Sequence, residues 1–240
     1  MLNVVLAEAA LETIPKKIIF HPSVVAWAKG MGKKTNRALL DRSYHHRAMF
    51  SLDEGLKRGR PDIVHFSLLE ALGTPLNKEG MLRTYVHTVE NLLIYMKPEI
   101  RLPRNYNRFM GLIEQLFRTN RVPEHGQMLL KLKKGRLNDL LDEIKPSYVL
   151  AFTRLGVPKT LHEVMCSLVK MEKPLVIVGA FPKGHFSEET VKLTNELVSI
   201  DPEVLNAWTV TSRIIYEYER LIELPEKLLE RQNDMENTLR

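Results

Sequence analysis

The chain has 240 residues, of which 44% are hydrophobic and 27% are charged, and its formal net charge at pH 7 is +6. This composition is ordinary for a soluble globular protein with a sizeable core, and it excludes an intrinsically disordered chain. The single cysteine, Cys166, excludes an internal disulfide and a multi-cysteine zinc site, and it suits a reducing cytosol.

The amino-terminal segment, residues 1–15, has no basic start, and its apolar run is interrupted by Glu8. We therefore expect no signal peptide. The longest apolar runs of the chain have the length of strands, which leaves no candidate for a membrane-spanning helix. The sequence accordingly predicts a cytoplasmic protein that has no membrane partner.

In chain order, the first predicted element is a strand over residues 2–7, a nearly continuous apolar run rich in β-branched side chains. A helix is predicted over residues 62–72, and a hairpin of two strands over residues 83–96. Apolar residues at helical spacing predict a further helix over residues 104–117. A possible strand over residues 127–132 completes this middle part of the chain.

Two more apolar runs, residues 147–152 and 174–181, flank a helical pattern at residues 161–169. This order of strand, helix and strand is typical of a parallel sheet between helices. Cys166 falls within the helical pattern, and we expect it to lie in the core. The predicted fold class is therefore α/β, interrupted at about residues 40–135 by an α+β elaboration.

The carboxyl-terminal part begins with a predicted strand over residues 197–200 and a loop over residues 201–206. A strongly amphipathic helix follows over residues 207–222, with Asn206 in the position of its N-cap. The tail after Pro225 is acidic, and we expect it to be helical and peripheral.

Positive charge is concentrated in residues 97–136, where ten Lys and Arg stand against three Glu, a local balance of +7. The rest of the chain is therefore close to neutral. Within this segment Arg101, Arg104 and Arg108 follow one another at spacings of three and four residues, across Pro103. Because arginine binds phosphate through two planar hydrogen bonds, we favour phosphate recognition over a merely solvated surface by about two to one.

A glycine loop, GAFPKG, follows the predicted strand at residues 174–181. Its spacing resembles that of a nucleotide phosphate loop, but His185 stands where such a loop needs a lysine. Gly179 and Gly184 either let the backbone approach a ligand at the end of the strand or merely turn the chain, and the residues favour the two readings equally.

Arg60 and Asp62 flank a proline at the predicted start of the helix over residues 62–72. Asp62 either caps this helix or holds the side chain of Arg60. His45 and His46 are adjacent and have no neighbouring carboxylate or cysteine cluster, so we interpret them as structural or surface residues and expect no metal site.

These features by themselves indicate an α/β protein with a ligand loop and a basic arm, an enzyme that acts on RNA. Four longer stretches then resemble one family, the Nep1 (also called Emg1) methyltransferases, in its archaeal branch. They are LLDRSYHH, RPDIVHFSLLEAL, IRLPRNYNRFMGLIEQL and VGAFPKGHFS. The resemblance extends from about Leu2 to Ile222, and the motifs follow one another in the order that the family has.

This resemblance implies a SPOUT fold with a trefoil knot near the carboxyl terminus, in a single domain over residues 1–240. It implies a homodimer with the cofactor sites close to the subunit interface. The implied reaction is transfer of a methyl group from S-adenosylmethionine to N1 of a pseudouridine in a hairpin loop of small-subunit rRNA, during ribosome biogenesis. Ribosomal assembly proteins are further expected partners, and S-adenosylhomocysteine is the expected product.

Site residues follow from the same resemblance. The implied cofactor-binding residues lie in three loops: Thr153, Gly179, Gly184, Ile200, Asp201, Pro202, Glu203, Val204 and Leu205. The implied RNA-binding residues are Arg60, Arg101, Arg104 and Arg108. Arg60 and Asp62 are the implied catalytic residues, with Asp62 holding the guanidinium group of Arg60, and no metal ion takes part.

Two alternatives remain beside this enzyme. One is a non-catalytic RNA-binding assembly factor, in which the knotted domain is only a scaffold for the arginines. The other is a methyltransferase that acts on another RNA or another base. The glycine loop and the loop at residues 200–205 favour an enzyme, because a protein that only binds RNA has no need of them.

Overall fold

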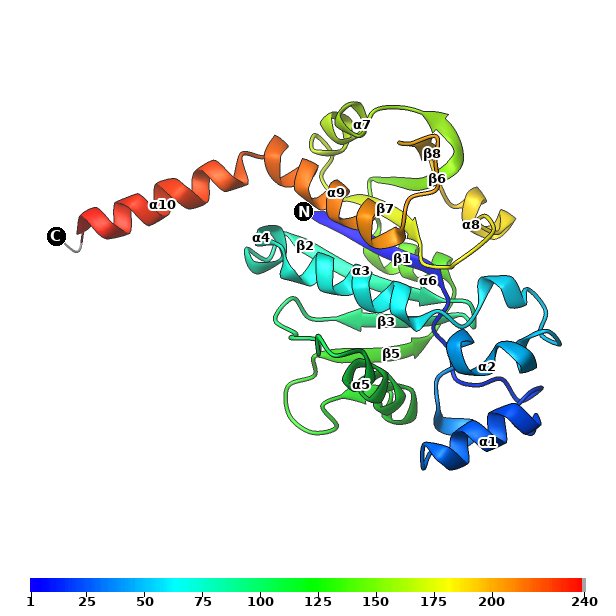
Figure 1. The fold of residues 1–240 in the computed structure, drawn as a ribbon. Helices are drawn as coiled ribbons and strands as arrows, with labels where there is room; N and C mark the ends of the chain where they lie inside the picture. The colour runs from blue at the N-terminus through cyan, green and yellow to red at the C-terminus, as the bar shows by residue number, and fades with distance from the viewer. Residues whose placement is uncertain (239–240) are drawn as a thin grey trace.

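The computed structural model describes residues 1–238, and within them eight strands form one mixed sheet covered by helices on both faces (Figure 1). The strands are β1 (Leu2–Ala9), β2 (Leu82–Thr88), β3 (Leu92–Met96), β4 (Arg121–Val122), β5 (Leu130–Lys134), β6 (Tyr148–Pro158), β7 (Pro174–Gly179) and β8 (Glu196–Ser199). Their order across the sheet is β4-β5-β3-β2-β1-β7-β6-β8.

Helices of very different lengths connect these strands. The α-helices are α1 (Pro22–Gly30), α2 (Arg42–Met49), α3 (Pro61–Gly73), α4 (Pro75–Lys78), α5 (Tyr106–Thr119), α6 (Leu137–Ile144), α7 (Leu161–Leu168), α8 (Glu188–Lys192), α9 (Ala207–Leu221) and α10 (Leu224–Thr238). Two short 3₁₀ helices are η1 (Thr35–Arg37) and η2 (Gly55–Lys57). No helix within residues 1–238 is both long enough and apolar enough to cross a membrane.

The parallel centre of the sheet confirms the strands predicted from apolar runs. β2, β1, β7, β6 and β8 are parallel neighbours, whereas β3 and β5 join antiparallel to one side. Every residue of β1 is buried, as expected of a strand with helices on both of its faces. The α/β class and the predicted hairpin of β2 and β3 are therefore both confirmed.

Two hydrophobic cores occupy the two faces of the sheet. Val4 and Leu6 of β1 point into the larger core, which α3, α5, α7 and α9 cover. Val5 and Ala7 point into the smaller one, which is covered by α6. This alternation follows from the two-residue period of a strand. The carboxyl ends of the parallel strands then meet at one edge of the sheet, which remains available for a site.

A third, separate core lies in the amino-terminal part of the chain, where α1 and α2 pack together beside the sheet (Figure 1). Its buried residues are Ile14, Ile18, Val24, Ala38, Leu40, Ala48, Met49 and Leu52. We call residues 14–52 the α1–α2 module. The sequence patterns had not predicted it, because its apolar residues are spread over short helices and turns.

Two sequence-based expectations were wrong in detail, the start of the helix over residues 104–117 and the core position of Cys166, whereas the N-cap position of Asn206 was confirmed. The helix predicted over residues 104–117 begins only at Tyr106, because the side chain of Asn105 accepts a hydrogen bond from the backbone N of Arg108 and caps it. Arg104 therefore lies before the helix. Asn206 occupies the N-cap position of α9 but makes no side-chain capping bond. Cys166 is half-buried and lies outside the hydrophobic cores.

Gly156 allows an unusually close approach of two backbones. Phe152 and Val157 of β6 both lie opposite Val198 of β8, so the residues between them bulge out of the sheet. A Cβ atom on Gly156 would lie 2.4 Å from the backbone N of Val198 and 2.5 Å from the carbonyl carbon of Leu197. Backbone atoms cannot yield as a flexible side chain can, so this position accepts only glycine.

We therefore predict that Gly156→Ala lowers the free energy of unfolding by about 1–3 kcal/mol, the usual cost of forcing an extra methyl group into a packed region. Chemical denaturation measures this change. Gly111→Ala is the matched control, because Gly111 lies inside α5 with nothing near its Cβ position, and it should gain about 0.5–1 kcal/mol. Unchanged stability of Gly156→Ala would contradict the close approach.

Candidate functional site

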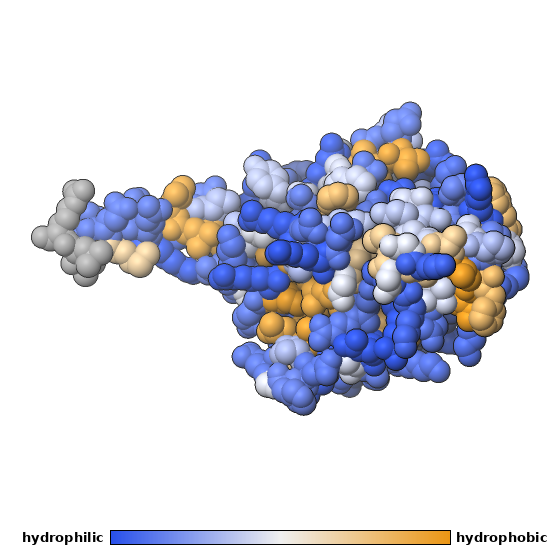
Figure 2. All heavy atoms as spheres, turned by 60° about the horizontal axis from the view of Figure 1, so that its bottom comes forward, coloured by the Kyte–Doolittle hydropathy of each residue, from blue (hydrophilic) through white to orange (hydrophobic). Residues whose placement is uncertain are grey.

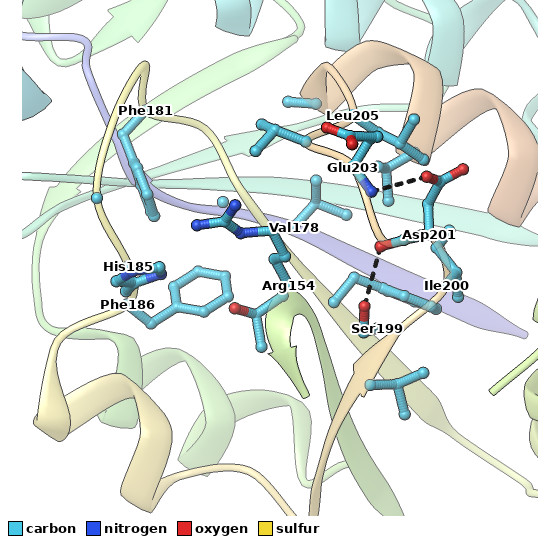
Figure 3. Close-up of a pocket in the computed structure, with 18 of the residues that line it drawn as sticks. Arg154, Val178, Phe181, His185, Phe186, Ser199, Ile200, Asp201, Glu203 and Leu205 are labelled. Carbon is cyan, nitrogen blue, oxygen red and sulfur yellow. Dashed lines mark hydrogen bonds between the residues drawn. The ribbon is translucent and has the colours of Figure 1, made fainter. Parts of the chain in front are cut away.

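A cavity of about 540 Å³ opens at the carboxyl edge of the parallel strands (Figure 3). Three segments form its wall: the bulge of β6, the loop that follows β7, and the loop that follows β8. Ligands of open α/β sheets bind at this edge, and the volume falls within the range of small-molecule sites. The cavity is therefore the strongest candidate for the site of a small organic ligand.

Most of the residues expected to bind a cofactor line this one cavity. They are Thr153, Gly179, Gly184, Ile200, Asp201, Glu203, Val204 and Leu205. Pro202 is the exception, because it is not among the lining residues. The structure thus brings together loops that lie far apart in the sequence, while a cofactor-binding role for each residue stays a prediction.

Sequence reasoning missed the charged and aromatic side chains of the wall. Arg154, Lys183 and His185 line the cavity together with Phe181 and Phe186. In Figure 3 the guanidinium group of Arg154 lies between these rings and the loop that carries the two carboxylates of the wall. The signal was present in the sequence, since each of these residues lies within two positions of Thr153, Gly179 or Gly184.

The two glycines of the loop after β7 have different roles. A Cβ atom on Gly179 would lie 2.9 Å from the ring of Phe181, which in turn meets Phe186 edge to face at 5.6 Å. Gly184 has a φ of +99° and open space around it, so its requirement is conformational. Gly179 accordingly makes room for an aromatic wall, and Gly184 turns the chain.

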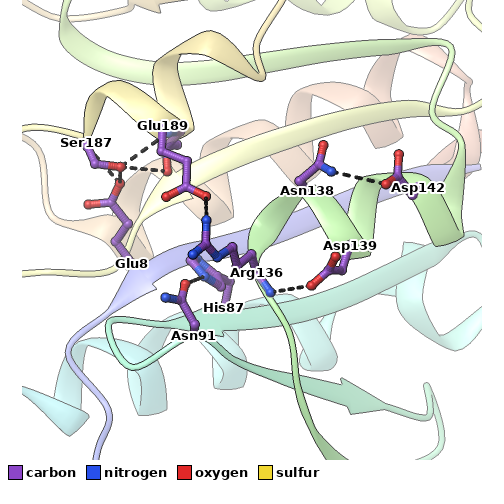
Figure 4. A network of polar contacts seen from close by, with 10 residues as sticks. Glu8, His87, Asn91, Arg136, Asn138, Asp139, Asp142, Ser187 and Glu189 are labelled. Carbon is purple, nitrogen blue, oxygen red and sulfur yellow. Dashed lines mark hydrogen bonds and ion pairs between the residues drawn. The ribbon is translucent and has the colours of Figure 1, made fainter.

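A buried ion pair fixes this loop to the rest of the protein. The Nζ atom of Lys57 donates to the carboxylate of Glu8 and to the backbone O of His185, the latter at 2.6 Å, and lies 4.4 Å from the ring centre of Phe181. Glu8 Oε1 also accepts from the backbone N and the Oγ of Ser187, both at 2.8 Å (Figure 4). One lysine and one glutamate thereby hold both ends of the cavity loop.

Both side chains of this pair are largely removed from water, with exposures of 11% for Lys57 and 9% for Glu8. Burial acts to raise the pKa of Glu8, but the hydrogen bonds from Lys57 and Ser187 outweigh it and hold that pKa below its ordinary value. Glu8 is therefore ionised at neutral pH and is committed to Lys57 and Ser187.

Arg60 and Asp62 form the bidentate pair that the resemblance implied. Arg60 Nε and Nη2 donate to Asp62 Oδ1 and Oδ2 at 2.7 and 2.6 Å, which raises the pKa of Arg60. The backbone places this pair beside the cavity, because Arg60 N donates to Ala10 O and Ala10 N donates to Ala180 O. Asp62 is thus a partner of Arg60 and does not use its side chain to cap α3.

The three arginines of the basic segment extend from an anchored backbone. Within residues 1–238 the guanidinium groups of Arg101, Arg104 and Arg108 are exposed and make no ion pair. The chain between them is fixed, because His65 Nε2 is bonded to Pro103 O at 2.7 Å and Tyr106 donates to Asp41 Oδ2 at 2.6 Å. Burial and this bond raise the pKa of Tyr106. Such unpaired arginines can bind phosphate without first breaking a salt bridge.

The adjacent histidines differ, and the structure gives them no common ligand. His45 is fully buried, its Nδ1 accepts from the backbone N of Asp41 at 3.0 Å, and burial lowers its pKa. His46 is exposed. Within residues 1–238 no three His, Cys, Asp or Glu side chains are grouped in a way that could hold a metal ion.

Comparison with known proteins gives one consistent result. A family model described as EMG1/NEP1 methyltransferase matches residues 4–219. Two relatives described as Nep1 ribosomal RNA small subunit methyltransferases, from Thermococcus onnurineus and Thermococcus kodakarensis, are 46% and 44% identical to this chain. These alignments cover 92% and 93% of the chain and 100% of each relative.

A solved structure is also similar over most of its length. The crystal structure of Archaeoglobus fulgidus Nep1 bound to S-adenosylhomocysteine shares 41% identity with the chain and superimposes with a TM-score of 0.82. The match covers 92% of this chain and 98% of that one.

The buried ion pair generates a prediction about stability and pH. Lys57→Met leaves the Glu8 carboxylate buried without a counter-charge, and it should lower the free energy of unfolding at neutral pH by about 3–5 kcal/mol. In the wild type the pKa of Glu8 is lowered, so the contribution of the pair is present above the ordinary value of 4.5 and is lost as the pH falls through the lowered value. Denaturation curves across this range measure it.

In Lys57→Met the burial of Glu8 is no longer opposed by the lysine, so protonation relieves the strain. The stability gap between the wild type and this variant should therefore narrow on acidification. The double variant Glu8→Gln, Lys57→Met should recover most of the loss, because it buries no charge. A gap that stays constant with pH would show that Glu8 is not the group responsible.

Proposed function

This chain belongs to the EMG1/NEP1 methyltransferase family, and from that premise we propose that it transfers a methyl group from S-adenosylmethionine to N1 of a pseudouridine in small-subunit rRNA. Its family and its relatives' names make it an S-adenosylmethionine-dependent methyltransferase of small-subunit rRNA. The observation that carries the proposal is the position of Arg60, held by Asp62, beside a cavity suited to a small organic cofactor. The segment of arginines without ion pairs within residues 1–238 is fixed to the same helix, α3, through His65.

The residues of the cavity fit the methyl donor. S-adenosylmethionine supplies a methyl carbon that its sulfonium already activates. Apolar side chains such as Val178, Val198 and Leu205 suit an adenine ring, and the carboxylates of Asp201 and Glu203 suit the positive charge of the donor. Asp201 Oδ1 accepts from the backbone N of Glu203 at 3.0 Å, which fixes this loop before any ligand binds. The similar Archaeoglobus protein binds S-adenosylhomocysteine, the product expected of this reaction.

The arginines would position the RNA. The guanidinium group of Arg60 is held in place by two hydrogen bonds to Asp62. Arg101, Arg104 and Arg108, which make no ion pair within residues 1–238, would bind the phosphates and bases of a hairpin loop. A base in a loop is presented more cheaply than one in a duplex. The protein's main contribution is then alignment of N1 with the methyl carbon and exclusion of water.

We further propose that the reaction uses no dedicated strong base. Both carboxylate oxygens of Asp62 already accept hydrogen bonds from Arg60, which leaves the acid poorly placed to take the proton of N1. Asp62 is then an orienting residue for Arg60. The proton of N1 would leave to solvent at or after methyl transfer.

The remaining features of the family are proposals for this chain. We propose a trefoil knot in which the segment after β8 passes through the β6–α7–β7 crossover; α9 lies against α7 and α3, as such a path requires.

We propose a homodimer, which would cover the exposed apolar side chains of Leu155, Val157 and Val204 near the cavity. We also propose that residues 1–240 form one domain, that the protein acts in the cytoplasm during ribosome biogenesis, and that ribosomal assembly proteins are partners.

Substrate choice is tested with two matched RNA hairpins, one with pseudouridine and one with uridine at the target position. We expect methyl transfer from S-adenosylmethionine to the pseudouridine hairpin alone, because only pseudouridine has a free N1–H. Mass spectrometry of the RNA product gives the readout. Methylation of both hairpins would refute the assignment to N1, and methylation of neither would leave a non-catalytic assembly factor.

The role of the arginines is tested by Arg104→Ala. We expect RNA binding to weaken by about 1–3 kcal/mol, because one charge-assisted contact is lost, while S-adenosylhomocysteine binding stays unchanged. Fluorescence anisotropy and calorimetry measure the two affinities. Arg231→Ala on α10 is the matched control, since it removes one arginine that is paired with Glu79. Equal losses of RNA and cofactor binding in Arg104→Ala would mean that Arg104 is structural.

A further inference from the structure

A second basic segment lies outside the arginine-rich residues 97–136. Residues 16–47 carry eight Lys and Arg against one acid, Asp41, so their local balance is also +7. Since the whole chain has a net charge of +6, everything outside these two segments is acidic overall. Net positive charge is therefore concentrated in two segments of the chain, and only residues 97–136 have a proposed role so far.

The second segment is an ordered scaffold. It makes up most of the α1–α2 module, which has its own hydrophobic core, and the side chain of Trp27 on α1 meets His45 on α2 edge to face at 4.4 Å. Residues displayed by a packed scaffold keep fixed relative positions. A partner can therefore bind them without first ordering the chain.

Contacts join the α1–α2 module directly to α5, the helix that begins between Arg104 and Arg108. Lys33 Nζ donates to both carboxylate oxygens of Glu114 on α5, at 2.7 and 2.9 Å, and Leu39 N donates to the same group. Tyr106 at the start of α5 donates to Asp41. Asp41, the one acid of residues 16–47, and Glu114, one of the three acids of residues 97–136, thus both form hydrogen bonds between the two segments.

The charged side chains that remain exposed on the module are all basic, because its one acid, Asp41, is buried. Within residues 1–238, Lys29, Lys34, Arg37 and Arg47 are exposed and make no ion pair. The module lies beyond the same edge of the sheet at which α3 and its Arg60 begin (Figure 1). Figure 2, which brings the lower side of that view forward, shows mainly hydrophilic residues over the body of the protein, interrupted by separate hydrophobic patches.

Two exposed aromatic rings accompany these cations. Phe20 just before α1 is 83% exposed, and Phe50 just after α2 is 87% exposed. Aromatic rings interleaved with Lys and Arg suit unpaired RNA bases, which stack on them while the backbone contacts the cations. An acidic protein surface would match the charge alone and gives no reason for the rings.

We propose that the α1–α2 module is a second RNA-binding surface, which contacts rRNA flanking the target hairpin through Lys29, Lys34 and Arg37. This inference rests on the proposed function, because it assumes that the target hairpin occupies Arg60, Arg101, Arg104 and Arg108. The module continues that surface across α5. A longer rRNA fragment therefore gains phosphate contacts that a minimal hairpin lacks.

The test compares two RNAs and two triple variants. One RNA is the minimal target hairpin, and the other carries the natural flanking sequence on both sides. The first variant is Lys29→Ala, Lys34→Ala, Arg37→Ala. The control is Lys78→Ala, Lys170→Ala, Lys173→Ala, which removes the same charge from exposed residues near the opposite edge of the sheet, where β2 and β7 begin.

We expect the wild type and the control to bind the longer RNA more tightly than the hairpin. The module variant should lose this advantage, with about tenfold weaker binding of the longer RNA and a salt dependence shallower by about 2–3 in logarithmic slope, as for three lost phosphate contacts. Its methylation of the minimal hairpin should match that of the wild type. Its thermal unfolding should remain cooperative, which shows that the module is still folded.

Three results would overturn the proposal: equal affinity of the wild type for both RNAs, wild-type binding of the longer RNA by the module variant, or loss of hairpin methylation in that variant. Wild-type binding of the longer RNA by the module variant would favour an acidic protein as the partner of this surface. Loss of hairpin methylation in that variant would show that the module is part of the hairpin site. None of these is failure of the proposed function, which would appear as a wild type that methylates neither RNA.

Discussion

The buried ion pair between Glu8 and Lys57 is the interaction on which the site depends. Glu8, the penultimate residue of the central strand β1, has a left-handed backbone with a φ of 49°, which a residue other than glycine rarely adopts. This turn directs its carboxylate to Lys57 and Ser187. Burying two charges is costly, and hydrophobic residues would often be as stable, so the benefit of such a pair can lie in geometry. Here it joins the centre of the sheet to the wall of the cavity.

Lys57 also lies close in the sequence to Arg60, so the anchor of the cavity loop and a proposed RNA contact are near neighbours in the chain. Lys57 holds the cavity loop through the backbone of His185, and Arg60, three residues later, is held by Asp62. Between them Arg58 is bonded to the buried carboxylate of Glu12. One short segment, residues 57–60, therefore carries both the anchor of the cavity loop and a proposed RNA contact.

Sequence patterns revealed the strands of the parallel sheet because each is a continuous apolar run, and they revealed the glycine loop of the cavity wall. Thr153 and the loop at residues 200–205 came from the resemblance. The patterns could not reveal the partners of Glu8, which interrupts such a run and meets Ser187 from the far end of the chain. The start of α5 could have been predicted from the sequence, since Asn105 is a favourable N-cap residue. Resemblance to a family supplied the candidate residues, whereas their relation in space came from the structure.

The second basic segment was missed for a simpler reason. The near-neutral sum outside residues 97–136 combined a segment of +7 with an acidic remainder, and a sum over many residues hides such opposites. In the structure the two positive regions adjoin, and the acids that might have weakened them, Asp41 and Glu114, are used in the contact between them. A body that is acidic elsewhere repels a polyanion, so an approaching RNA is steered to the edge of the sheet where the cavity and Arg60 lie. The charges that we propose to orient the RNA would therefore also raise its local concentration at the proposed methyl-donor site.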